Sequence, residues 1–258
     1  MKREKRATVP WMKAMGCAIV ATILLLIFVA IAMVYIEQSD NVGDCGDWDK
    51  QGIDVSHYQG IIDWDAIADE TNIKYVYIKA SEGASHRDSL YMRNTVEAHK
   101  RGIAVGSYHY FHPNVAVEEQ YKNFMSVVNQ GVQDLIPVID IEERAWKPSK
   151  QICDSLDKFS EMVEAHWGVK PIIYTHQRFY NTLLQRSFDD HILWIARYGT
   201  YKFKPEPSLE DARECCIWQY SNRGRVKGIN GYVDLNTLHP EADITDIMLK
   251  RRLKSSSF

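Results

Sequence analysis

Eight short apolar runs, rich in β-branched and aromatic residues, recur between residues 52 and 236 of this 258-residue chain. They cover residues 52–56, 74–81, 104–111, 136–142, 171–176, 192–198, 215–221 and 233–236. Runs of this length and composition predict buried strands. Helical patterns between the earlier runs predict a mostly parallel sheet, and eight strands close an α/β barrel. We therefore expect the α/β class, as an irregular TIM-like (β/α) barrel of about eight strands; an open doubly wound sheet is the alternative.

The clearest helical pattern covers residues 150–166. Its apolar stripe consists of Ile152, Leu156, Phe159 and Val163. Ser149 is expected to cap the start of this helix, and Gly168 follows its end. The later connections are thinner, because residues 181–185 and 209–214 would form at most short helices. We therefore expect few helices in the second half of the barrel.

Residues 14–36 carry no charge and are long enough to cross a hydrocarbon core of about 30 Å. Basic residues dominate the segment before this run, and acids follow it from Glu37 onward. The positive-inside rule then places the N-terminus in the cytoplasm and the rest outside the membrane. A cleaved signal peptide is the competing interpretation, but its apolar core usually spans only ~7–15 residues. The sequence favours an uncleaved, single-pass transmembrane helix.

The composition divides the chain into five parts. We expect a cytoplasmic basic N-terminus at 1–13, a transmembrane helix at 14–36, a juxtamembrane tether at 37–50, a barrel domain at 51–240 and a C-terminal extension with a basic tail at 241–258. The net charge of the chain is −3, and because residues 1–13 are basic, the part after residue 13 has a negative net charge, which argues against nucleic acid as a partner.

Four cysteines lie outside the apolar run, at Cys45, Cys153, Cys215 and Cys216, and their pairing cannot be deduced. No histidine or cysteine spacing indicates a metal site.

Acidic residues recur where the predicted strands end. Asp140 and Glu142 lie two residues apart at the end of one apolar run, so their side chains should share a face. Two crowded carboxyl groups favour keeping one protonated, as glycosidases do. Asp54, Glu82 and Asp234 are expected at the carboxyl ends of three other strands, and barrel closure should bring Asp54 beside Asp234. Active sites of barrels lie at that rim.

Aromatic and amide residues are expected at the same rim. They are Tyr108, Tyr110, Tyr174, Trp194, Tyr198, Trp218, Gln219 and Tyr220. Flat aromatic rings suit the apolar faces of sugars, although filling the barrel core explains such residues about equally well.

Six strings between residues 51 and 236 resemble the glycoside hydrolase family 25 lysozymes, in the same order. The strings are GIDVSHYQG (52–60), IKASEG (78–83), GSYHYF (106–111), PVIDIE (137–142), LWIARY (193–198) and WQYS (218–221) with GYVDLN (231–236). Two departures are Ser81, where the family usually has Thr, and Lys227, where Pro is common.

The resemblance implies an N-acetylmuramidase that cuts the β-1,4 bond between N-acetylmuramic acid and N-acetylglucosamine, without a cofactor or metal. Glu142 matches the general acid of the family. Asp140 matches its partner, which either attacks the sugar or orients the substrate acetamido group; Asp54 and Asp234 match accessory acids. The expected substrate-binding residues are Glu82, Tyr108, Tyr110, Tyr174, Trp194 and Gln219. Expected partners are peptidoglycan glycan strands and, through residues 14–36, a lipid bilayer, with the protein as a monomer.

Three alternatives stay open. A glycan-binding module without catalysis would keep the rim and lose turnover. A chitinase-like hydrolase shares the D-x-E ending, but Leu135 and Val138 replace two upstream acids of its longer motif. A purely structural membrane protein would not require acids at four strand ends.

Overall fold

The computed structural model describes residues 10–39, 51–199 and 206–250. The chain divides into two compact units, residues 1–42 and 43–258. Cys45, most of the expected tether and the basic tail lie outside the described residues. In the described part, Cys153, Cys215 and Cys216 are free thiols.

The first unit contains one long helix, α1 (Pro10–Ser39). Its segment Ala14–Ala32 has a mean hydropathy of 2.8 over 19 residues, which suffices in length and composition to cross a membrane. A signal sequence would meet the same criterion.

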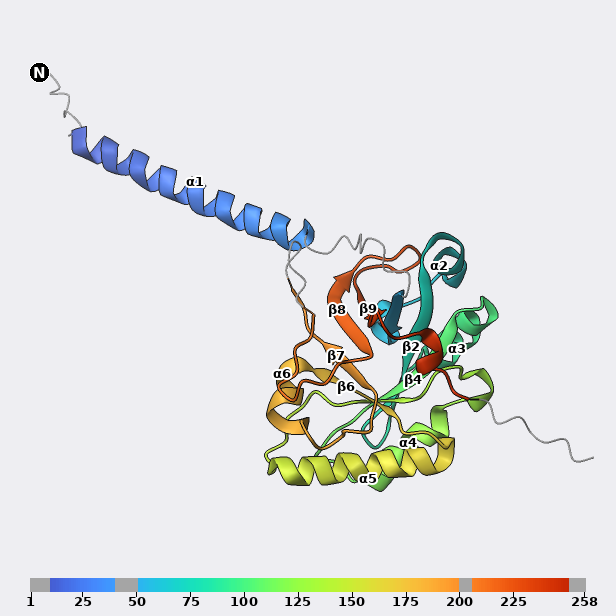
Figure 1. The fold of residues 1–258 in the computed structure, drawn as a ribbon. Coiled ribbons are helices and arrows are strands. Elements are labelled where there is room, and N and C mark those ends of the chain that lie inside the picture. Colours follow the sequence, from blue (N-terminus) through green and yellow to red (C-terminus); the bar gives the residue numbers. More distant parts are fainter. Residues whose placement is uncertain (1–9, 40–50, 200–205, 251–258) are drawn as a thin grey trace, which may run out of the picture. The chain divides into compact units, whose positions relative to one another are not determined.

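The second unit is a closed barrel (Figure 1). Its strands are β1 (Gln51–Val55), β2 (Ile73–Glu82), β4 (Ala104–Tyr110), β5 (Val138–Asp140), β6 (Ile172–His176), β7 (Leu193–Ala196), β8 (Ile217–Gly224) and β9 (Val233–Leu238). Pairing of β1 with β2 closes the ring, so the expected barrel is confirmed and the open sheet is wrong. A two-residue strand, β3 (His86–Arg87), adds an antiparallel hairpin at the end of β2.

Strand direction departs from the expectation at one point. Neighbouring strands run parallel from β1 through β2 to β8, but β9 is antiparallel to both β8 and β1. A short loop after Gly224 joins β8 to β9 as a hairpin, so no helix crosses over to restore the direction. Asp234 therefore lies at the amino end of its strand, and its predicted position at a carboxyl end is wrong.

Helices are concentrated in the first two thirds of the barrel. They are α2 (Trp64–Glu70), α3 (Tyr91–Lys100), α4 (Val117–Val127), α5 (Ser149–Trp167) and the three-residue α6 (Gln177–Phe179). A π turn (Tyr180–Leu184) follows α6, and 3-10 turns cover His57–Gln59, Gln130–Val132 and Ile244–Asp246. Residues 209–214 form a turn rather than a helix.

Helix α5 follows the predicted pattern with one correction. The four residues of its apolar stripe are all buried. Gly168 ends the helix at φ 74°, a left-handed conformation that glycine adopts without steric cost. Ser149 does not cap the start, because it is the first helical residue and Pro148 occupies the cap position.

The barrel interior is filled by side chains that alternate along the strands with residues facing the helices. Tyr75 and Tyr77 on β2 point inward and are fully buried. Gly52 and Gly106, on the two flanking strands, make room for these rings: a Cβ atom at either glycine would lie 2.2 Å from a tyrosine ring carbon. The interior is therefore packed, and the free space lies above it.

Candidate active site

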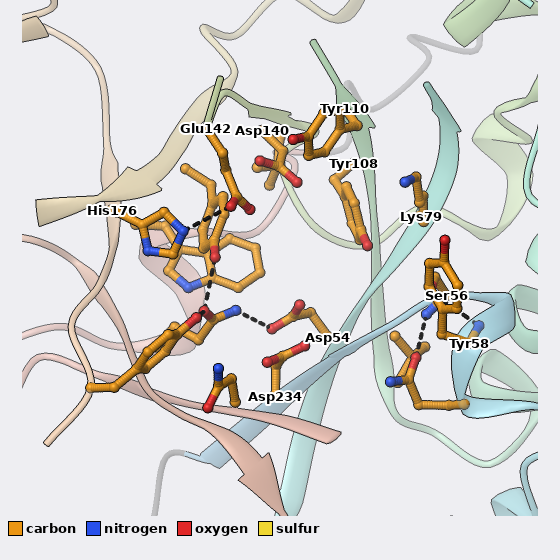
Figure 2. Close-up of a pocket in the computed structure, with 18 residues that line it drawn as sticks. Asp54, Ser56, Tyr58, Lys79, Tyr108, Tyr110, Asp140, Glu142, His176 and Asp234 are labelled. Carbon is orange, nitrogen blue, oxygen red and sulfur yellow. Dashed lines mark hydrogen bonds and ion pairs between the residues drawn. The ribbon is translucent and has the colours of Figure 1, made fainter. Parts of the chain in front are cut away.

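An open pocket of about 370 Å³ lies at the end of the barrel where the parallel strands finish (Figure 2). It brings together nine of the ten site residues predicted from sequence: Asp54, Tyr108, Tyr110, Asp140, Glu142, Tyr174, Trp194, Gln219 and Asp234. Glu82 is the exception. Segments up to 180 residues apart thus converge on one cavity, because barrel closure places their strand ends side by side.

Asp140 and Glu142 lie side by side on one wall of the pocket. Asp140 is the last residue of β5, and Glu142 follows just beyond the strand. Asp140 is only 6% exposed. Burial, followed by the charge of Glu142, raises the pKa of Asp140 well above its ordinary value. Its Oδ1 atom is buried and has no hydrogen-bond partner among the described residues.

His176, the last residue of β6, contacts Glu142 on the side away from Asp140. The Nε2 atom of His176 lies 2.8 Å from Oε2 of Glu142 (Figure 2). This hydrogen bond raises the pKa of His176. The contact fixes the direction of the Glu142 carboxyl group toward the pocket.

Asp54 is anchored by two side-chain amides. Gln219 and Asn236 donate to its Oδ2 atom at 2.9 and 2.8 Å. Burial raises the pKa of Asp54 to about 6, although these two hydrogen bonds favour the ionised form. Asp54 is therefore a fixed carboxyl group whose charge changes in the mildly acidic range.

Asp234 faces Asp54 across the β1–β9 pairing, where the two residues are direct partners. Burial and the neighbouring charge of Asp54 raise the pKa of Asp234 to about 8. Asp54 and Asp234 are therefore adjacent, as predicted, although Asp234 lies at the amino end of β9 rather than at its carboxyl end.

Tyrosine and tryptophan side chains hold the amides in place. Tyr174 and Tyr198 both donate to Oε1 of Gln219, and Trp194 donates to Oδ1 of Asn236 at 2.9 Å. Trp218 and Tyr220, which flank Gln219, point to the opposite face of β8 and join the outer core. Their predicted position at the rim is wrong, because alternate residues of a strand face opposite sides.

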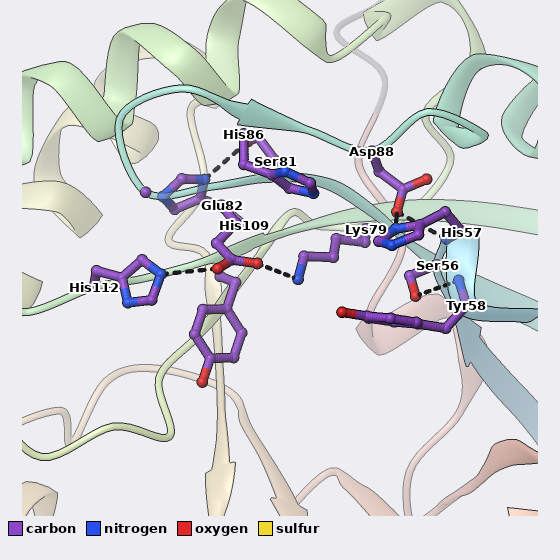
Figure 3. Close-up of polar contacts among 12 residues, drawn as sticks. Ser56, His57, Tyr58, Lys79, Ser81, Glu82, His86, Asp88, His109 and His112 are labelled. Atoms are coloured by element: carbon purple, nitrogen blue, oxygen red, sulfur yellow. Dashed lines mark hydrogen bonds and ion pairs between the residues drawn. The ribbon is translucent and has the colours of Figure 1, made fainter.

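Glu82 lies outside the pocket lining because two basic partners hold it. Lys79 Nζ donates to it at 2.6 Å, and His112 Nε2 lies 3.0 Å away (Figure 3). Burial works against the charged form, but these contacts outweigh it and lower the pKa of Glu82. Lys79 also lies 4.9 Å above the ring of Tyr110, so the acid supports a pocket wall.

Sequence reasoning missed Lys79 and His176, which are among the unpredicted residues that line the pocket, and Asn236, which supports Asp54 from outside the lining. Each is an isolated polar residue at an inward position of a β-rich run. Two of them could have been found from sequence, because residues two apart on a strand face the same side. His176 is two residues after Tyr174, and Asn236 is two residues after Asp234. The described residues contain no group of three or more histidine, cysteine or acidic side chains arranged to hold a metal.

The buried acids should make stability depend on pH. Because the pKa of Asp234 is about 8, the folded chain keeps a proton that the unfolded chain releases near pH 4. Stability contributed by this proton is therefore lost as the pH rises from about 4 to about 8. We expect Asp234→Asn to raise the melting temperature at pH 8 by on the order of 2–4 °C and to change it little at pH 4. Thermal unfolding of the full chain in detergent at both pH values measures this; an equal effect at both would contradict it.

Comparisons with known proteins agree with this geometry. Residues 53–229 match the family described as Glycosyl hydrolases family 25. The uncharacterized protein YegX of Escherichia coli strain K12 is 36% identical over 192 residues, which cover 73% of this chain and 69% of YegX. The autolytic lysozyme of Clostridium acetobutylicum is 32% identical over 186 residues, or 72% of this chain and 55% of that protein. A solved family 25 glycosyl hydrolase from Bacillus anthracis superposes with a TM-score of 0.68 at 33% identity, covering 74% of this chain and 89% of the other.

Proposed function

The chain belongs to glycosyl hydrolase family 25, a family of lysozymes and muramidases, and from this premise we propose that it cleaves the β-1,4 bond between N-acetylmuramic acid and N-acetylglucosamine. It is a glycoside hydrolase, and the family's substrate is peptidoglycan. The observation that supports cleavage of this particular bond is the pair of carboxyl groups on one wall of the pocket, Asp140 beside Glu142.

Glu142 is the general acid of the proposed reaction. It lies at the mouth of the pocket, partly exposed, with its carboxyl group held by His176. As the bond from the anomeric carbon to the leaving oxygen breaks, the Glu142 proton passes to that oxygen. In the second step the resulting carboxylate takes a proton from water, the water oxygen bonds to the anomeric carbon, and the bond that the nucleophile of the first step had formed to that carbon breaks.

Asp140 orients the substrate in this proposal. The two carboxyl groups lie on the same side of the pocket, whereas a retaining enzyme with its own nucleophile places one on each side of the sugar. A substrate acetamido oxygen would instead attack the anomeric carbon, and the Asp140 carboxylate, whose Oδ1 has no hydrogen-bond partner among the described residues, would accept the acetamido N–H once the substrate reaches it. The raised pKa of Asp140 favours its neutral form, and its proton would pass to the neighbouring Glu142 as the substrate binds.

Asp54 and Asp234 complete the proposed site opposite this pair. With pKa values of about 6 and about 8, they add negative charge as the pH rises, and that charge stabilises an oxocarbenium-like transition state. The amides of Gln219 and Asn236 keep Asp54 in a fixed position while it does so.

Identification of the new chain ends tests the proposed bond. The full chain, purified in detergent, is incubated with peptidoglycan, and the products are reduced with borohydride and analysed by mass spectrometry. Reduced muramic acid ends are expected. Reduced glucosamine ends would identify a glucosaminidase, and binding without new ends would identify a glycan-binding module that lacks catalysis.

We also propose that the apolar helix α1 tethers the barrel to a membrane, with the barrel on the outer side. Deleting residues 1–36 should then move the protein from the membrane fraction to the soluble fraction, because the segment Ala14–Ala32 is removed. The rate on solubilised glycan should stay within about twofold of the full chain, since the pocket lies entirely within the second unit. Fractionation and a reducing-end assay measure both. Recovery of the wild-type protein in the soluble fraction, as a product cleaved after the apolar run, would contradict the tether.

A further inference from the structure

Among the tryptophans whose burial the structure describes, Trp146 is the one left fully in solvent. Its side chain is completely exposed, whereas Trp64, Trp194 and Trp218 are at most 5% exposed. A tryptophan normally buries a large apolar area, so a fully exposed one on the surface of a folded domain suggests a binding role.

The backbone around Trp146 is held from both sides. Ala145 is buried in the core at 6% exposure, and Lys147 Nζ donates to the carbonyl oxygen of Pro113 at 2.8 Å. Trp146 is therefore presented by a segment whose neighbours are fixed, rather than by a free loop tip.

A second set of contacts joins the same two loops. Glu143 accepts hydrogen bonds from His112 Nδ1 at 3.0 Å and from the Tyr110 hydroxyl at 3.3 Å. His112 also contacts Glu82, so the array extends to the end of β2 (Figure 3). We call residues 112–113 and 143–147 the rim shelf. It is a braced platform at the end of β4 and β5, where the pocket opens.

The shelf is continuous with the proposed general acid. Trp146 follows Glu142 by four residues, so the two Cα atoms are at most about 14 Å apart. A glycan strand that runs through the pocket extends beyond it in both directions. The flat indole ring suits the apolar C–H face of a sugar ring, which it would cover by stacking.

We propose that Trp146 is a stacking platform for a sugar unit of the glycan strand that lies outside the pocket. This subsite rests on the proposed function, because it assumes that a polymeric glycan occupies the site. It provides binding energy on long chains and touches none of the reacting atoms.

The dependence of KM on glycan length tests the proposal. The full chain in detergent is assayed on a purified muramic acid–glucosamine tetrasaccharide and on uncrosslinked glycan strands of at least twelve sugars. Trp146→Ala should raise KM on the long strands by roughly tenfold, with kcat nearly unchanged. On the tetrasaccharide, KM should stay within about twofold of the wild type. Trp146→Tyr should recover most of the loss, because it restores a flat ring, and Trp146→Leu should not.

Met92→Ala is the matched control, since Met92 is 49% exposed on α3 and lies outside the rim shelf. It should leave both KM values unchanged. Equal KM values for the wild type and Trp146→Ala on long strands would overturn the platform, as would full recovery by Trp146→Leu. If the wild type cuts neither substrate, the proposed function fails instead, so the two failures are distinguishable.

Discussion

Replacement of Glu142 by Gln should lower kcat by about 10²–10⁴-fold, while binding to peptidoglycan is retained. The amide keeps the size and the hydrogen-bonding capacity of the carboxyl group, so its contact with His176 can persist. It has no acidic proton to give to the leaving oxygen, and no charge with which to deprotonate water. Reducing-end assays give kcat, and co-sedimentation with insoluble peptidoglycan gives the binding.

Glu97→Gln is the matched control for this variant. Glu97 is partly exposed on α3 and pairs with Lys100, outside the pocket lining. The same change of carboxyl to amide should leave both readouts unaltered there. Turnover of Glu142→Gln near the wild-type rate would remove Glu142 from the role of general acid.

Replacement of Asp140 by Asn should lower kcat by about 10²–10³-fold without loss of stability. Burial, followed by the charge of Glu142, raises the pKa of Asp140 well above its ordinary value and so favours the neutral form of this side chain. A neutral asparagine avoids the burial penalty that the charged form of Asp140 carries. It cannot, however, become a carboxylate that accepts the acetamido N–H and polarises the attacking oxygen.

The combination of two measurements separates this effect from unfolding. Thermal unfolding should give a melting temperature equal to or above that of the wild type, and the reducing-end assay should show the loss of rate. Asp154→Asn on α5, an exposed acid paired with Lys150, serves as the control for the chemical change. A variant with the wild-type rate would show that Asp140 has no part in the reaction, and a fall in rate matched by unfolding would assign it a structural role.

Strand existence was predictable because each strand carries its own local signal. All eight barrel strands overlap the runs identified by composition, and the buried stripe of α5 follows from its spacing. The composition of a single run does not indicate, however, whether the strand will run parallel or antiparallel to its neighbours in the sheet. The run that became β9 carries no local mark of its direction, and only the short hairpin after Gly224 makes it antiparallel to β8 and β1.

The orientation of side chains was less predictable than the strands. Trp218, Gln219 and Tyr220 are consecutive, and sequence alone treats all three as rim residues. In the barrel only Gln219 faces the pocket, where it holds Asp54. The choice depends on the register between β8 and its neighbours, which a pattern within one strand does not specify.

The sequence by itself determined the ingredients of this protein: an apolar helix, eight strands, and four acids that match a known family in order and spacing. It determined these because strand propensity, helical periodicity and motif spacing are local properties of the chain. The tertiary structure alone decided the chemistry of each acid. Burial of Asp140, the amides on Asp54, the position of Asp234 beside it and the contact of His176 with Glu142 all arise when distant strands meet. Proton affinity depends on desolvation and on neighbouring charges, and both are set only by the closed barrel.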